Sequence, residues 1–217
     1  VQPRFRPIPS LNLAYLKSKW QYSGSNYLVA LFAAAPTLLL PVVVLNLLGP
    51  ESNAYFFIAW MMANVLSAIA SAISNALFAE GVHFEDRLGE DVRKTLKFTF
   101  MVLVPLVVVL IAGGKWLLLI FGPGYSTTGL GLLQVVALSS LPIGVNYIYT
   151  GVLRVRGRLR EMTIIWGFIA VATLVVSYLV APVTGIIGIG YAWLGVHGSV
   201  AIYVTVVIRK QLRRGSI

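Results

Sequence analysis

The side chains in this sequence that could bind or react with a ligand are polar groups that interrupt long apolar runs. The candidates for binding a ligand are Asn26, Asn64, Asn75, Asn146, Tyr149 and His197. A polar group inside an apolar run is costly in lipid unless it faces the protein interior or a water-filled cavity. Amides and hydroxyls hydrogen bond a ligand without altering it. These residues therefore predict binding rather than covalent chemistry.

His197 admits two interpretations, because it lies in the middle of an apolar run among glycines. An imidazole can titrate near neutral pH, which would suit proton coupling. A single polar side chain in a membrane helix can also hold a neighbouring helix by a hydrogen bond. The sequence alone leaves both interpretations open.

Catalytic groups are scarce in the same runs. No Asp or Glu lies well inside an apolar run, and the chain has no cysteine. Paired carboxylates for acid–base catalysis and clusters with metal-ligand spacing are therefore missing from these runs. The sequence also has neither a G-x-S-x-G motif nor a Walker loop. We expect no enzymatic activity, no metal and no cofactor.

Long apolar runs also set the fold class. Hydrophobic residues make up 58% of the chain and charged residues 11%, whereas soluble domains have ~25% charged residues. A helix needs about 20 apolar residues to cross a bilayer. The six predicted spans are residues 25–48, 53–78, 95–121, 129–153, 161–181 and 185–210. The sequence thus predicts an all-α polytopic membrane protein.

Basic residues orient this predicted bundle. Every lysine and arginine except Lys115 lies before the first run, in or at the edge of an alternate gap, or at and beyond the end of the last run. Lys and Arg accumulate on the cytoplasmic side of membranes, so both termini are expected there. Residues 1–22 are then an interfacial cytoplasmic segment, 23–210 the six-helix bundle and 211–217 a basic cytoplasmic tail. The net charge of +10 flanks the spans, which argues for contact with anionic membrane lipids and against nucleic acid.

The second predicted span carries small and weakly polar residues at every fourth position. One row is Ala59, Ala63, Ser67, Ser71 and Asn75, and the adjacent row is Asn64, Ala68, Ala72 and Ala76. Small residues let membrane helices pack closely, so this face could form a helix–helix contact. Alternatively, part of it could line a water-filled cavity, with Asn64 and Asn75 as its markers.

Prolines and glycines mark possible interruptions of the spans. Pro36 and Pro41 lie inside the first span, where each removes a backbone donor and is expected to kink the helix. Such interruptions mark moving or substrate-lining helices in transporters, and a fixed bend is the alternative. Gly113 and Gly114 mark a point where the third span could break, with Trp116 at the outer interface.

Several phrases match a known pattern in order along residues 11–210. They are PTLLLPVVVLNLLGPESNAYFFIAW, ISNALFAEG, KFTFMVLVPLVVVL, IFGPGYSTTGLGLL, GVLRVRGRLREM and VTGIIGIGYAW. In these phrases the chain resembles the C-terminal half of Wzx-type polysaccharide flippases, in the MOP superfamily that also holds MATE multidrug exporters. The resemblance implies one six-helix lobe of a two-bundle plasma-membrane transporter that moves lipid-linked oligosaccharide by alternating access.

The resemblance also implies partners and residue roles. Family members carry two such bundles in one chain of about double this length, so an N-terminal lobe or a second subunit is expected; the start at Val1 likewise suggests a fragment or a processed chain. The asparagines would hydrogen bond sugar hydroxyls. Some lipid-linked-sugar flippases place basic residues against pyrophosphate, and here that role falls to the other half or to loop residues such as Arg154.

Two other functions stay open. A MATE-like cation-coupled exporter of small molecules usually needs a carboxylate in the membrane, and no carboxylate lies well inside these spans. A non-transporting scaffold of an envelope-assembly complex could equally be a dense, uncharged six-helix bundle.

Overall fold

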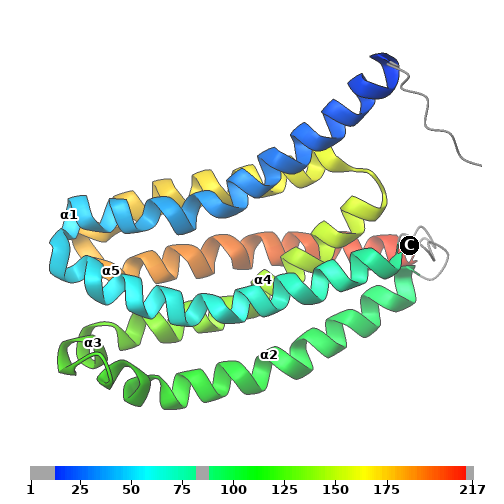
Figure 1. The fold of residues 1–217 in the computed structure, drawn as a ribbon. Helices are drawn as coiled ribbons and strands as arrows, with labels where there is room; N and C mark the ends of the chain where they lie inside the picture. The colour runs from blue at the N-terminus through cyan, green and yellow to red at the C-terminus, as the bar shows by residue number, and fades with distance from the viewer. Residues whose placement is uncertain (1–12, 82–87, 214–217) are drawn as a thin grey trace, which may run out of the picture.

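The computed structural model describes residues 13–81 and 88–213, which form helices and the short connections between them. The helices are α1 (Leu13–Gly81), α2 (Leu88–Leu119), α3 (Pro123–Thr128), α4 (Leu130–Val155) and α5 (Leu159–Arg213). They form one bundle in which α1, α4 and α5 pack together and α2 lies along α4 and α1 (Figure 1). The described part of the chain contains no strand, which confirms the all-α class.

Helices α1 and α5 each consist of two helical segments joined at a glycine. Gly49 has φ 84° and ψ 173°, and Gly185 has φ 66° and ψ −157°. Both residues have positive φ, which glycine adopts readily because it has no Cβ. Figure 1 shows the chain reversing direction at the end of the bundle where α1 and α5 are labelled, so the segments of each helix run antiparallel. The two glycines lie within or beside predicted connections.

Within residues 13–81 and 88–213, four helices are long and apolar enough to cross a membrane. Two of their apolar stretches, Gly24–Ala76 and Leu159–Lys210, contain the glycine breaks and are 53 and 52 residues long. Each is more than twice the ~20 residues that one crossing needs. These lengths leave room for two crossings in each helix. The count of six spans and the domain boundaries at residues 22 and 210 stay predictions.

The helices begin and end at other residues than the predicted spans, because hydropathy locates apolar runs and a helix can extend beyond them. Helix α1 begins at Leu13, inside the segment predicted to be interfacial, and α2 begins at Leu88. In the first turns of α2, Lys94 forms an ion pair with Glu90 at 2.8 Å. The predicted connection at residues 122–128 contains the short helix α3. The predictions for residues 1–12, 82–87 and 214–217 lie outside the described residues.

The break expected at Gly113 and Gly114 is wrong. Helix α2 runs through both residues. Gly114 is buried against α4, where the Cδ2 atom of Leu133 lies 2.6 Å from the position that a Cβ would take. The glycine therefore permits a close helix contact. Pro36 and Pro41 also lie in continuous helix, since the non-helical residue of α1 is Gly49, and their predicted kinks stay predictions.

Two apolar clusters form the core. The first includes Leu40, Phe56 and Trp60 and lies toward the Gly49 break. The second includes Val152 and Met162 and lies toward the opposite end of the bundle. Because neighbouring turns of α4 and α5 contribute to both clusters, polar side chains on those turns lie at the junction between them.

Candidate functional site

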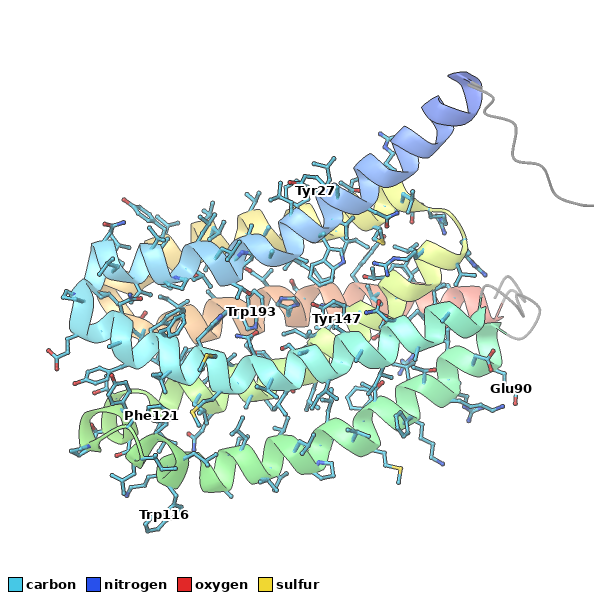
Figure 2. The ribbon with its side chains drawn as sticks, viewed as in Figure 1. Tyr27, Glu90, Trp116, Phe121, Tyr147 and Trp193 are labelled. Atoms are coloured by element: carbon cyan, nitrogen blue, oxygen red, sulfur yellow. The ribbon has the colours of Figure 1, made fainter. Side chains whose placement is uncertain are left out.

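A polar cavity lies between both segments of α1, α4 and α5, in the half of the bundle away from the Gly49 break. Its volume is about 210 Å³. It is lined by Asn26, Val29, Ala30, Ala33, Ser71, Ser74, Asn75, Tyr147, Thr150, Arg154 and Trp166. Figure 2 shows Tyr147 within the bundle. Amides, hydroxyls and a guanidinium among apolar walls suit a ligand with polar groups.

Arg154 supplies positive charge to this cavity. Its Nη1 donates a hydrogen bond of 3.3 Å to Asn75 Oδ1, which joins α4 to the second segment of α1. Arg154 lies in the last turn of α4, where the negative end of the helix dipole favours a cation. The described residues that line the cavity include no carboxylate. The cavity is therefore electropositive.

Ser74 ties the second segment of α1 to α4. Ser74 Oγ donates to the Tyr147 carbonyl at 2.6 Å, and Ser71 and Tyr147 both line the cavity. Toward the Gly49 break, Ala59 and Ala63 are fully buried in the core. The row of small residues at positions 59, 63, 67, 71 and 75 thus packs tightly at one end and lines the cavity at the other.

The adjacent row of small residues behaves differently. Ala68, Ala72 and Ala76 are exposed. Asn64 is only half-buried, and its Nδ2 donates to the Trp60 carbonyl at 2.9 Å. This row therefore forms no tight contact within the described chain.

Hydrogen bonds behind the cavity connect Trp166 to His197. Trp166 Nε1 donates to Thr150 Oγ1 at 3.1 Å, and Thr150 Oγ1 donates to the Asn146 carbonyl at 2.8 Å. Asn146 Nδ2 contacts His197 Nδ1 at 3.2 Å and donates to the His197 carbonyl at 3.1 Å. An amide nitrogen only donates, so Nδ1 accepts, and the proton of the neutral ring is on Nε2. His197 thus links α4 to α5.

Aromatic rings continue this connection across the junction of the two apolar clusters. Ring centroids are 5.0 Å apart for Tyr147 and Trp166, 4.2 Å for Trp193 and His197, and 5.0 Å for Trp60 and Trp193. The last two pairs are edge-to-face, a favoured geometry for aromatic contacts. Figure 2 shows Trp193 and Tyr147 inside the bundle. The rings form a close-packed wall next to the cavity.

The structure brings four of the predicted site residues close to one another. Asn26 and Asn75 line the cavity, while Asn146 and His197 are paired behind it and are both buried. The link between Asn146 and His197 matches the hydrogen-bonding interpretation of the histidine. Proton coupling, and the binding of a ligand by any of these residues, stay predictions.

The remaining predicted residues lie elsewhere. Asn64 is not among the residues that line the cavity, and Tyr149 lines a separate groove. The α4 wall is made instead by Tyr147, Thr150 and Arg154. Their spacing of three and four residues places them on one helix face. That spacing is the signal that sequence reasoning missed.

The side chains that line the cavity can bind a ligand through hydrogen bonds and charge. Among the described residues, no group of three or more His, Cys, Asp or Glu side chains could hold a metal ion. The lining offers hydrogen-bond donors, acceptors and one positive charge.

Comparison with known proteins finds matches among solved structures. No model of a known protein family matches the chain, and no curated protein matches it. MATE in the straight conformation has a TM-score of 0.70 and 16% identity, with 88% of this chain and 44% of that chain covered. MATE in the bent conformation has a TM-score of 0.63 and 18% identity, with 87% of this chain and 42% of that chain covered.

A third similar structure is a MOP superfamily transporter from Pyrococcus furiosus, whose binding pocket has a reversed polarity that suggests a different function. It has a TM-score of 0.64 and 17% identity, with 84% of this chain and 41% of that chain covered. The chain therefore spans less than half the length of the structures it matches. At these identities the likeness shows the fold, and the chain has the helical fold of part of these MATE and MOP superfamily transporters.

Proposed function

We propose that this chain is the C-terminal six-helix lobe of a MOP superfamily transporter that moves lipid-linked oligosaccharide across the plasma membrane. The observation that carries the proposal is the composition of the cavity: one guanidinium, several amides and hydroxyls, and no carboxylate among its described lining residues. The likeness of the fold to MATE and MOP superfamily transporters supports transport as the general activity.

The cavity chemistry matches a phosphate-linked sugar. A guanidinium binds phosphate oxygens with two parallel hydrogen bonds, which an amide cannot do. The contact between Arg154 and Asn75 is 3.3 Å long, and an incoming phosphate could replace the amide as the acceptor. Asn26, Asn75 and the Tyr147 hydroxyl would then face the sugar hydroxyls.

The size of the cavity fits half of a transport site. Its volume of about 210 Å³ is below the ~300–1,000 Å³ of typical ligand pockets. A headgroup of several sugars therefore needs a second wall. In this proposal, that wall comes from an N-terminal lobe or a second subunit, and the two lobes rock around the substrate in alternating access.

The predicted orientation completes the proposal. Arg156, Arg158 and Arg160, in the connection after α4 and the first turn of α5, lie at the same end of α4 as Arg154. With both termini in the cytoplasm, this end is cytoplasmic. The cavity then receives substrate from the cytoplasmic leaflet.

The test is translocation of a lipid-linked oligosaccharide by the full transporter in reconstituted vesicles. Arg154→Gln should lower the rate at least about tenfold, because a charge-assisted hydrogen bond contributes ~1.5–3 kcal/mol. Arg154→Lys should lose less than Arg154→Gln, since it keeps the charge. Arg160→Gln is the matched control, because Arg160 is exposed and is not a lining residue. An unchanged rate for Arg154→Gln would contradict the proposal.

A MATE-like exporter of small molecules is the second candidate, because two of the similar structures are MATE proteins. A cationic substrate would meet the positive charge of Arg154 with no lining carboxylate to offset it. Efflux of an organic cation that depends on a Na⁺ or proton gradient, without oligosaccharide translocation, would favour this candidate.

A further inference from the structure

A second hollow lies on another face of the α4–α5 pair. It is a groove of about 530 Å³ between α4 and the two segments of α5. Ile164, Phe168 and Val200 provide apolar walls, and Glu161 lies at the end where α5 begins. Ile164 and Phe168 are 60% and 55% exposed. The groove shares none of its lining residues with the cavity that holds Arg154.

One end of this groove carries both signs of charge. Glu161 is a lining residue, and its Oε1 forms an ion pair with Arg158 Nη2. The two side chains are 41% and 42% exposed. An ion pair this exposed contributes little to stability, so both groups can take on further ionic partners at small cost. The pair presents a carboxylate and a guanidinium next to an apolar groove.

We propose that this groove binds one aminophospholipid of the phosphatidylethanolamine class. The ammonium of the lipid contacts Glu161, its phosphate contacts Arg158, and an acyl chain lies along Ile164, Phe168 and Val200. The acyl chain has room because Phe168 lies about 10 Å along the helix from Glu161, at 1.5 Å per residue. The proposal does not rest on the transport function.

Charge complementarity selects this lipid over phosphatidylglycerol and phosphatidylcholine. An anionic phospholipid without an amine, such as phosphatidylglycerol, offers a phosphate for Arg158 but nothing for the carboxylate, which then repels it. Phosphatidylcholine has a positive headgroup whose nitrogen carries no hydrogen, so it cannot donate to Glu161. Only a primary ammonium makes charge-assisted hydrogen bonds to the carboxylate while the phosphate pairs with the guanidinium.

The experiment is lipid retention by the purified full chain, measured by native mass spectrometry from neutral detergent. The probes are phosphatidylethanolamine, phosphatidylcholine and phosphatidylglycerol with identical acyl chains. The wild type should retain phosphatidylethanolamine about tenfold more than the others, as one added charge-assisted hydrogen bond predicts. Glu161→Gln should reduce its retention to the level of phosphatidylcholine. Lys115→Gln, an exposed change on α2, should leave the preference intact.

A charge swap separates lipid binding from a structural role of the ion pair. Arg158→Glu combined with Glu161→Arg keeps an i,i+3 ion pair and the net charge but reverses its polarity. The swapped chain should remain folded and lose the preference for phosphatidylethanolamine. Equal retention of the three lipids by the wild type, preferential retention of phosphatidylglycerol, or a preference that survives the swap would each overturn the proposal.

Discussion

Replacing Asn146 tests whether the polar junction behind the cavity holds α4 and α5 together. Asn146 is 1% exposed, and its Nδ2 contacts both the ring nitrogen and the carbonyl of His197, 51 residues later in the chain. Asn146→Ala removes both contacts. It also leaves the buried Nδ1 atom of His197 without the donor that the described structure gives it.

The expected loss follows from the two contacts. Hydrogen bonds between membrane helices contribute ~0.6–1.7 kcal/mol each, so the pair contributes about 1–3 kcal/mol. Alanine has a higher helix propensity than asparagine, and this difference offsets up to ~0.5 kcal/mol of the loss in stability. We expect Asn146→Ala to destabilise the folded chain by about 2 kcal/mol.

Asn64→Ala is the matched control. Asn64 is also a helical asparagine, but it is half-buried, and its side chain donates to the carbonyl of Trp60, one turn earlier in the same helix. The same propensity gain applies, while no contact between helices is lost. Asn64→Ala should therefore change stability by less than about 0.5 kcal/mol.

The assay is reversible unfolding in mixed micelles, followed by the fluorescence of the tryptophans. Trp193 and Trp166 lie 4.2 and 6.3 Å from the His197 ring, centroid to centroid, so they report on this junction. The comparison between the two alanine variants decides the matter. If Asn146→Ala loses no more stability than Asn64→Ala, the pair with His197 does not join the two helices.

Three further substitutions test other parts of the fold in the same unfolding assay. Gly49→Ala should destabilise the fold by about 1–3 kcal/mol, because φ at this break is 84° and strains a residue with a Cβ. Gly113→Ala should stabilise the fold by about 0.5–1 kcal/mol, because a Cβ at this position in a regular helix meets nothing within 4 Å. Equal changes in stability for Gly49→Ala and Gly113→Ala would contradict the positive φ at Gly49. Trp166→Phe keeps an aromatic ring but loses the bond to Thr150, and should cost at least about 0.5–1.5 kcal/mol.

Much of the helical layout could be predicted from local properties of the sequence. A run of about 20 apolar residues has few options other than a helix in lipid. The breaks at Gly49 and Gly185 lie within or beside predicted connections, where glycine interrupts the hydrophobic pattern. The all-α class follows from the same physics.

Tertiary contacts could not be predicted in this way. Gly113 and Gly114 look alike in the sequence, yet a Cβ on Gly114 would lie 2.6 Å from Leu133 Cδ2 while one on Gly113 would meet nothing within 4 Å. The difference depends on where α4 lies, which no local pattern states. Likewise Asn64 and Asn75 differ by three helical turns, and only the position of α4 decides that Asn75 reaches the cavity.

The hydropathy pattern places Arg154 in a loop, whereas the structure places it in the last turn of α4. Hydropathy ends the predicted span at residue 153, whereas α4 continues to Val155. A helix end is set by backbone hydrogen bonds, and a cation in the last turn is favoured by the helix dipole rather than excluded. The flexible arginine side chain then reaches Asn75, 79 residues earlier in the chain. A charged side chain that binds a ligand near the end of a span can therefore belong to the last helical turn, which hydropathy alone assigns to a loop.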